Sequence, residues 1–280
     1  MTVKFTADST CDLTPELIAQ HDVGIVPLYI VNDDGAFRDG VEITPQDIFA
    51  AAERTGKLPT TSAVPAVDYY SCWSELQQRC DTVIHISLSS ELSSSYHNAC
   101  LAAEELGNVW VVDSRSLCAG GALLVLEGAE MAAAGIEPAA IAQQLQARAE
   151  KLDVSFVLDT LSYLRKGGRC SPVAALGANL LSIKPSIEVH NGTMDVGKKY
   201  RGKIDHVYLQ YARERLEGRD DIDLEQIFIA DSGISDECRA EIERTVLACQ
   251  PFKKVYHNLA GCTISTHCGP NCMGLMFLCK

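Results

Sequence analysis

Two clusters of hydroxyl side chains are the first residues in the sequence whose types and spacing could bind a ligand. One is Pro59-Thr60-Thr61-Ser62, and the other extends from Ser87 to Ser95 and includes Ser93 and Ser94. The second cluster follows an apolar strand and precedes an expected helix, whose first N–H groups are free to bind an anion. A helix cap explains any single hydroxyl more simply. The two clusters together favour a binding site for an anionic group.

A cationic turn and one histidine are the other candidates. The segment Leu164-Arg165-Lys166-Gly167-Gly168-Arg169 combines cations with glycines. Glycine allows close backbone approach, and arginine can bind a carboxylate with two hydrogen bonds. A glycine-capped helix end with cations that complement the helix dipole is an equally good interpretation. His267 precedes Gly269-Pro270 in what we interpret as a loop after a strand. A lone histidine is more often structural, although a loop position favours a functional role.

One segment imitates a phosphate-binding loop. Gly192 to Lys199 matches G-x-x-x-x-G-K-[ST] except at its last position, where Lys199 replaces the hydroxyl that binds Mg²⁺. The pair Asn191-Gly192 predicts a β-hairpin there instead. The sequence also contains no G-x-G-x-x-G and no G-x-S-x-G. Nucleotide binding and α/β-hydrolase chemistry are therefore disfavoured.

The charge of the chain disfavours several classes of partner. Its 280 residues carry a formal net charge of −13 at pH 7. We expect no binding to nucleic acid, which needs a basic surface, and anionic lipid surfaces are disfavoured for the same reason. No apolar run approaches the roughly 20 residues needed to span a bilayer, and the first residues do not resemble a secretory signal. We therefore expect no stable membrane insertion and a cytoplasmic location.

The 12 cysteines raise the alternatives of disulfides and of a metal site. Disulfide frameworks belong to short secreted chains, and no Cys-x-x-Cys pair occurs. His267 lies among Cys262, Cys268, Cys272 and Cys279, but these spacings match no common zinc motif. We expect buried free thiols, no metal and no cofactor.

Apolar strands alternate with helical segments in the first half, which is typical of an α/β fold with parallel strands. Thr14-Pro15 and Thr44-Pro45 each place an N-cap before a proline at the first helical position. The helix over 121–134 is apolar almost all round and should be buried. We expect strands over 3–7, 23–31, 82–88 and 109–112, and further helices over 46–54, 95–106 and 138–152.

The second half has a more antiparallel character because of the predicted hairpin at Asn191-Gly192. We expect strands over 154–158, 186–189, 226–230 and 274–278, and a helix over 172–181. The whole chain, 1–280, is therefore predicted to form one module of two α/β lobes. The N-terminal lobe (1–155) should contain a parallel sheet, and the C-terminal lobe (156–280) a mixed or antiparallel sheet.

In chain order, six segments resemble motifs of the DegV family of bacterial proteins. Each is weak alone, but the ordered set is specific and extends over almost the whole chain. The segments are Ala7-Asp8-Ser9-Thr10-Cys11-Asp12-Leu13, Pro59-Thr60-Thr61-Ser62, Ser87-Leu88-Ser89-Ser90 through Ser93 and Tyr96, Tyr163-Leu164-Arg165-Lys166-Gly167-Gly168-Arg169, Leu180-Leu181-Ser182-Ile183-Lys184-Pro185 and Thr266-His267-Cys268-Gly269-Pro270.

This resemblance implies a two-lobed protein that binds a long-chain fatty acid, such as palmitate or oleate, in a tunnel between the lobes. Matching positions imply that Thr61 and Ser93 take the carboxylate. They also imply that Ser62, Arg169 and His267 support it, and we count Ser94, beside Ser93, with these ligand-binding residues.

Some members of the family are the fatty-acid-binding subunit of a bacterial fatty acid kinase, whose separate kinase subunit phosphorylates the carboxylate. Arg201 matches an arginine linked to docking that subunit. The resemblance implies a lipid carrier with no catalytic residue of its own.

The sequence departs from the family pattern at Glu91, Ser94 and Asn271, where glycine is usual. Two other functions remain open. One is a serine-dependent hydrolase that uses Ser93 as nucleophile and His267 as base, which would require contact between the two and an acid that orients the histidine. The other is a metal-binding protein that uses the cysteines around His267.

Overall fold

The computed structural model of the protein describes residues 2–175 and 183–280. The first half contains β1 (Val3–Asp8), η1 (Ser9–Cys11), α1 (Pro15–Gln20), β2 (Gly24–Val26), β3 (Tyr29–Asn32), β4 (Gly35–Arg38), α2 (Pro45–Thr55), β5 (Thr60–Ser62), α3 (Ala66–Leu76), β6 (Thr82–Ser87), α4 (Ser95–Leu106), β7 (Val109–Asp113), α5 (Ala119–Ala133) and α6 (Pro138–Ala149). The second half contains β8 (Leu152–Val157), α7 (Ser162–Gly167), α8 (Ser171–Ala175), β9 (Ile183–His190), β10 (Thr193–Arg201), α9 (Ile204–Leu216), β11 (Ile222–Asp231), α10 (Asp236–Cys249), β12 (Lys254–Leu259), α11 (Cys262–Cys268) and β13 (Met273–Cys279).

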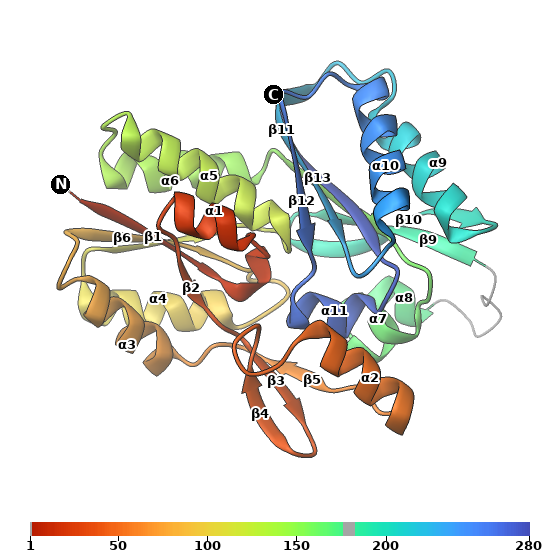
Figure 1. Ribbon diagram of the computed structural model, residues 1–280. Coiled ribbons are helices and arrows are strands. Elements are labelled where there is room, and N and C mark those ends of the chain that lie inside the picture. The colour runs from red at the N-terminus through yellow and green to blue at the C-terminus, as the bar shows by residue number, and fades with distance from the viewer. Residues whose placement is uncertain (1, 176–182) are drawn as a thin grey trace.

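The N-terminal sheet is parallel throughout, in the order β2-β1-β6-β7. Helices α5 and α6 cover one face and α3 and α4 the other (Figure 1). Because both faces are covered, every residue of β6 is buried. The expected caps also form: Thr14 accepts a hydrogen bond from the Leu17 N–H, and Thr44 forms a capping box with Asp47. The prediction of a parallel α/β first half is confirmed.

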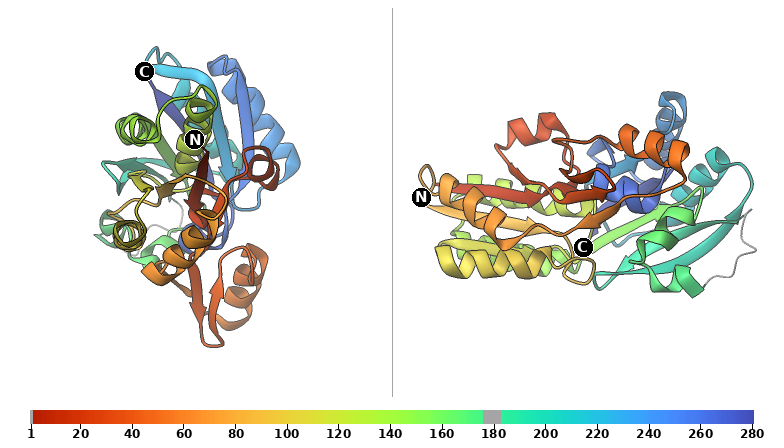
Figure 2. Two further views of the ribbon diagram at one scale, coloured as in Figure 1. Left: turned by 90° about the vertical axis from the view of Figure 1, so that its left-hand side faces the viewer. Right: turned by 90° about the horizontal axis from the view of Figure 1, so that it is seen from below.

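The C-terminal sheet is mixed, in the order β10-β9-β8-β13-β11-β12, and its pairs are antiparallel except for β11 with β12. The predicted hairpin joins β9 to β10. Asn191 and Gly192 form its turn with φ of 50° and 86°, as a tight turn with two left-handed residues requires. Seen from below, the two sheets follow one another along the long dimension of the molecule (Figure 2). The prediction of two sheets of different character is confirmed.

Helix α5 joins the two sheets. It packs against β1 and β6 of the parallel sheet and against β8 and β13 of the mixed sheet. Its residues from Ala119 to Leu126 are all buried, which explains why its sequence is apolar on every side. One apolar cluster contains residues of both sheets. The two halves therefore share a core.

Two features of the observed fold were not predicted from the sequence. The strand expected over 23–31 is two strands in different sheets, because Pro27 lies between β2 and β3 and has no N–H for a ladder. A small sheet of order β4-β3-β5 was not predicted. Strand β8 spans the expected boundary at 155/156 and pairs only in the mixed sheet. The exact division of the lobes therefore stays a proposal.

Part of one expected element lies outside the described residues. Of the helix expected over 172–181, the structure describes α8 up to Ala175, and residues 176–182 are not described. Within the described ranges, no helix has the length and apolarity needed to cross a membrane.

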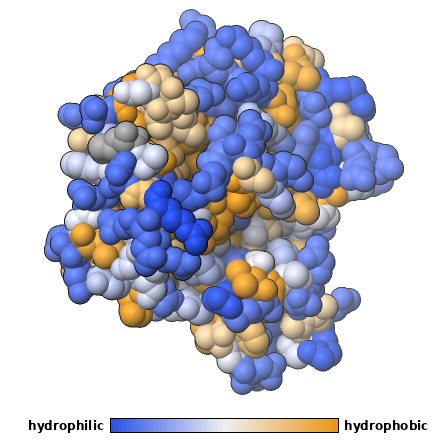
Figure 3. Space-filling view, turned by 60° about the vertical axis from the view of Figure 1, so that its left-hand side comes forward, coloured by the Kyte–Doolittle hydropathy of each residue, from blue (hydrophilic) through white to orange (hydrophobic). Residues whose placement is uncertain are grey.

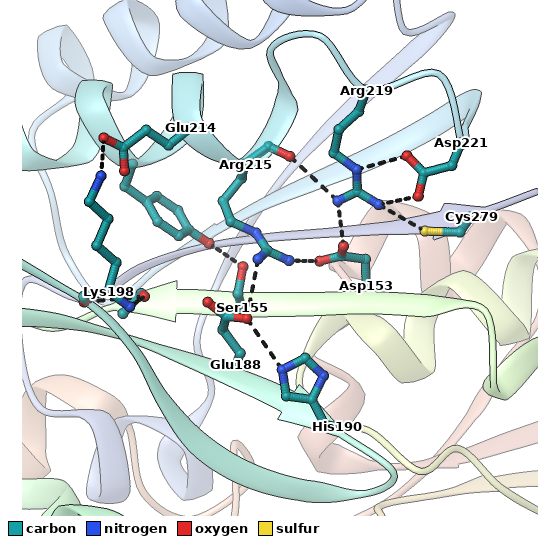
Figure 4. A network of polar contacts seen from close by, with 12 residues as sticks. Asp153, Ser155, Glu188, His190, Lys198, Glu214, Arg215, Arg219, Asp221 and Cys279 are labelled. Carbon is teal, nitrogen blue, oxygen red and sulfur yellow. Dashed lines mark hydrogen bonds and ion pairs between the residues drawn. The ribbon is translucent and has the colours of Figure 1, made fainter.

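Ion pairs fix α9 to the mixed sheet (Figure 4). Arg215 and Arg219 both bind Asp153 of β8, and Arg215 also lies 3.3 Å from Glu188 of β9. The Tyr211 and Ser155 hydroxyls are 2.7 Å apart in the same region. The network therefore holds the end of α9 against β8 and β9. On the face shown in Figure 3, apolar side chains lie in a hollow bordered by hydrophilic residues.

Candidate functional site

A mostly apolar cavity lies between the parallel and the mixed sheet. Its walls come from both halves of the chain, and its polar groups gather from β5, the turn before α4, the end of α7 and α11. The lining residues are Leu28, Thr61, Ser62, Ala63, Leu88, Leu92, Ser93, Leu117, Phe156, Leu164, Arg169, Met194, Thr263, Ile264, His267 and Cys268.

A hydrogen bond between Thr61 and His267 lies at the polar part of the cavity. The Thr61 Oγ1 and His267 Nε2 atoms are 2.9 Å apart, although the residues are 206 positions apart in sequence. Thr61 is fixed by the pairing of β5 with β3. His267 is in the last turn of α11, so the prediction of a loop around it is wrong. The segment is a helix that ends at Cys268, and Gly269, with φ of 74°, is its C-cap. A rigid element therefore positions the histidine.

The His267 ring is held in an environment that disfavours its charged form. Burial, together with the positive charge of Arg169, lowers the pKa of His267 to about 4. Its Nδ1 atom is buried and has no hydrogen-bond partner among the described atoms. A Cβ added to Gly167 would lie 2.1 Å from this Nδ1, so only glycine leaves room for the ring. His267 is therefore neutral at pH 7, and its Nε2–H can donate to Thr61 while the Thr61 hydroxyl donates to a ligand.

Ser93 is positioned by the start of α4. Its Oγ accepts a hydrogen bond from the Ser95 N–H at 3.2 Å and lies 3.0 Å from the Ser95 hydroxyl. The Ser95 hydroxyl in turn accepts a hydrogen bond from the Val64 N–H at 3.3 Å. Ser62 is exposed at the edge of the cavity, and its hydroxyl makes only a long contact with the Ala63 carbonyl. The hydroxyl clusters of the sequence therefore meet at one place.

Arg169 follows a glycine C-cap. The Gly168 N–H donates to the Leu164 carbonyl and Gly168 has φ of 69°, so α7 ends in the left-handed cap that the sequence suggested. Arg169 donates from Nη1 to the Gly167 carbonyl at 2.9 Å, is exposed, and lines the cavity. The two interpretations of this segment are compatible, because the cap directs the arginine to the cavity.

The full length of the chain matches a known family. The model of the DegV family, described as a family of uncharacterised proteins, matches residues 2–280. The chain belongs to the DegV family. A DegV domain-containing protein of Deinococcus radiodurans is 31% identical over 283 residues, which is 98% of each chain.

Two solved structures are similar over nearly the whole chain. One is a fatty acid-binding DegV family protein from Thermus thermophilus. It is 29% identical, with a TM-score of 0.89 and full coverage of both chains. A stearic acid-binding protein from Eubacterium ventriosum is 26% identical with a TM-score of 0.83, covering 99% of this chain and 98% of the other.

Two of the predicted site residues, Ser94 and Arg201, lie outside the cavity lining. Ser94 is exposed at the N-cap of α4 and its side chain makes no capping hydrogen bond. Arg201 is exposed at the end of β10. Of the departures from the DegV pattern, Asn271 has φ of 56°, a conformation that asparagine tolerates in place of glycine. Glu91 is exposed and lies 3.6 Å from Arg115.

Most of the apolar lining was not predicted from the sequence, and neither were the α11 residues Thr263, Ile264 and Cys268. Their spacing with His267 is a signal that could have been used, because 263 and 267, and 264 and 268, are each four apart and share a helix face. For Leu28, Leu117, Phe156 and Met194 no comparable signal exists, because apolar residues of this kind occur throughout any core.

The geometry disfavours the two alternative functions. The Nε2 atom of His267 contacts Thr61, and Ser93 pairs with Ser95, so no Ser93–His267 hydrogen bond is present. Among the described atoms no carboxylate contacts Nδ1 to orient the ring. The described residues also include no group of three or more His, Cys, Asp or Glu side chains that could hold a metal ion.

Proposed function

We propose that the protein binds one long-chain fatty acid in the cavity between the lobes, with the carboxylate at Thr61 and Ser93. The single observation that carries this proposal is the cavity itself. Apolar side chains line most of it, while hydroxyl side chains that include Thr61 and Ser93, a neutral histidine and an arginine form its polar part. Fatty acid binding by similar proteins of the family supports the same ligand.

The chemistry of the lining suits both parts of such a ligand. Burying about fifteen methylene groups at about 0.8 kcal/mol each gives about 12 kcal/mol, which offsets much of the entropy lost on binding. A carboxylate buried without partners would cost several kcal/mol. Donation from the Thr61 and Ser93 hydroxyls and the charge of Arg169 remove that penalty.

We also propose that the protein is a carrier that presents the carboxylate to a separate kinase subunit in the cytoplasm. This part rests on the match of Arg201 to a family arginine that is linked to docking the kinase subunit. Arg201 is exposed and outside the cavity lining, so it is free to contact another protein. The lobes over 1–155 and 156–280 would enclose the acyl chain. Neither a metal nor an organic cofactor has a place in this scheme.

The first experiment tests whether the ligand is a fatty acid. Protein purified from a bacterial host should carry about one fatty acid per chain, because the proposed ligand would occupy the apolar cavity in the cell. Native and denaturing mass spectra of one sample measure the mass of the ligand. Protein that is free of lipid and also fails to take up added palmitate or oleate contradicts the proposal.

The second experiment tests the placement of the carboxylate. Arg169→Ala and Ser93→Ala should each weaken binding of oleic acid, while binding of oleyl alcohol changes less, because only the acid carries a charge. Isothermal titration with both ligands gives the ratio of affinities. Equal losses for acid and alcohol would mean that these residues shape the cavity instead.

The third experiment tests presentation to a kinase. Arg201→Ala should retain lipid affinity and lower the rate of acyl phosphate formation with a compatible kinase subunit and ATP. His267→Ala should slow phosphorylation because the histidine lies beside the carboxylate. Arg244→Ala, which removes an exposed arginine from α10, is the control. Loss of lipid binding in Arg201→Ala, or turnover of a substrate by the protein alone, contradicts the proposal.

A further inference from the structure

The motif Ala7-Asp8-Ser9-Thr10-Cys11-Asp12-Leu13 is not explained by the proposed ligand. None of its residues is among the described residues that line the cavity. Asp8 is buried, and its carboxylate accepts hydrogen bonds from the Ser87 hydroxyl and the Leu88 N–H, so it fixes the loop after β6. Ser9 and Asp12, in contrast, reach toward the start of α11, the helix that carries His267.

Asp39 lies at the centre of the contact between the N-terminal half and the start of α11. Its side chain is buried and directly follows β4. Oδ1 accepts a hydrogen bond from the Cys262 N–H at 2.9 Å, and Oδ2 accepts one from the Thr263 N–H at 3.1 Å. Oδ2 also accepts a hydrogen bond from the Ser9 hydroxyl at 3.0 Å. A carboxylate 223 positions away in sequence therefore satisfies two of the free N–H groups of this helix.

Asp12 completes the arrangement. Its Oδ1 accepts a hydrogen bond from the Gly261 N–H at 3.0 Å. Burial raises the pKa of Asp12 well above its ordinary value, and the nearby Asp39 carboxylate adds to the shift. Asp12 and Asp39 together bind three successive N–H groups. The start of α11 is thus attached to the N-terminal half of the chain, although α11 itself follows β12 of the mixed sheet.

The other end of α11 is attached to the same small sheet. Asp39 follows β4 and Thr61 belongs to β5, and both strands pair with β3. Because α11 has only seven residues, one carboxylate and one hydroxyl of this sheet hold its first and last turns. The Cys262 side chain adds packing against Ile30 and Ile48 at the first turn. A shift of the first turn therefore changes the position of the His267 ring relative to Thr61.

We propose that Asp39, supported by Ser9, is a positioning residue for the carboxylate site: it fixes α11 so that His267 meets Thr61. The inference rests on the proposed function, because the affected property is recognition of the fatty acid head group. Asp39 touches no ligand in this scheme. It acts through the backbone of α11, and the motif around Ser9 is explained by the same contact.

The experiment compares Asp39→Ala, Asp39→Asn and Ser9→Ala with a control, Ser235→Ala. Ser235 is the N-cap of α10, accepts a hydrogen bond from the Cys238 N–H, and does not line the cavity. Two properties are measured. One is the ratio of affinities for oleic acid and oleyl alcohol, and the other is the pKa of the His267 ring by nuclear magnetic resonance.

Asp39→Ala should lower oleic acid affinity on the order of tenfold, which is the size expected for the loss of a helix cap. Oleyl alcohol affinity should change less. The pKa of His267 should rise from about 4 toward 6.5, because the ring leaves its buried position. Asn keeps one acceptor, so Asp39→Asn should give a smaller change, and Ser9→Ala the smallest. Ser235→Ala should leave both properties as in the wild type.

Unchanged values of both properties in a folded Asp39 variant overturn the inference. If Asp39→Ala does not fold, Asp39→Asn and Ser9→Ala provide the same test, and unchanged values in both variants overturn the inference. The His267 measurement needs no lipid. Wild-type protein that binds neither ligand, while the ring pKa still rises in Asp39→Asn, would therefore refute the proposed function and leave the positioning role intact.

Discussion

The polar and the apolar parts of the cavity are built in different ways. The polar part depends on single directional contacts between distant segments, such as the 2.9 Å hydrogen bond between Thr61 and His267. The apolar part is formed by leucine, phenylalanine and methionine side chains from many elements, and no single contact dominates. In the proposed function, selection of an acid over a neutral lipid would depend on a few atoms, whereas retention of the acyl chain would depend on the total area buried.

This difference gives each part its own experimental signature. A change in the polar part should alter the ratio of affinities for a fatty acid and its alcohol. A change in the apolar part should alter both affinities by a similar factor.

Gly167→Ala should have the largest effect. The new Cβ would lie 2.1 Å from His267 Nδ1, so the ring or α11 must move and the Thr61 contact is lost. We expect oleic acid affinity to fall by about tenfold or more, with a smaller loss for oleyl alcohol. Gly128→Ala is the matched control, because its Cβ would meet the Phe5 ring at 2.5 Å away from the cavity lining. It should lower stability without changing the ratio, and a changed ratio there would contradict the comparison.

Leu117→Trp tests the apolar part. Leu117 is buried and lines the cavity, so the larger side chain occupies space that the acyl chain needs. Acid and alcohol should both lose affinity by a similar factor, about tenfold. Titration calorimetry measures the two affinities, and thermal unfolding checks that the variant is folded. A selective loss for the acid would show that the two parts are not independent.

The burial of His267 predicts a dependence of stability on pH. Its pKa is lowered from 6.5 to about 4, so the unfolded chain binds a proton between these values and the folded protein does not. The contribution of the neutral, buried ring to the free energy of unfolding is therefore fully present above pH 6.5 and is lost as the pH falls toward 4. It amounts to at most about 3 kcal/mol.

His267→Gln removes this titration. Its free energy of unfolding, measured with urea on lipid-free protein from pH 7 to pH 4.5, should fall less than that of the wild type. His190→Gln, which removes an exposed histidine, should follow the wild type. The same slope in His267→Gln and wild type would mean that the ring is not held in a neutral, buried state.

The parts of this structure that could be predicted from the sequence are those with local signals. Asn191-Gly192 predicted the β9–β10 hairpin, Thr44-Pro45 predicted the start of α2, and the apolar helix at 121–134 predicted a buried α5. The motifs also identified Thr61, Ser93, Arg169 and His267, all of which line one cavity.

What could not be predicted depends on contacts between distant residues. Asp39 follows an exposed strand and has no pattern of its own, yet it binds N–H groups 223 positions away. The helical state of α11 is another case. Its sequence, Cys262-Thr263-Ile264-Ser265-Thr266-His267-Cys268, contains β-branched residues that favour strands. Carboxylates from elsewhere in the fold satisfy its first N–H groups, so tertiary contacts decide its conformation.

Ser94→Ala should have the smallest effect and gives the sharpest test of position. Ser93 and Ser94 are neighbours with the same side chain, but only Ser93 is among the lining residues, while Ser94 is exposed and makes no capping hydrogen bond. Exposed side chains without such contacts usually change stability by less than about 0.5 kcal/mol. We therefore expect Ser94→Ala to leave oleic acid affinity within about twofold of the wild type, whereas Ser93→Ala lowers it selectively relative to the alcohol. Titration of both variants with both ligands decides this. A loss in Ser94→Ala equal to that in Ser93→Ala would mean that the start of α4 changes shape when the lipid binds, so that Ser94 turns toward the carboxylate in the bound state.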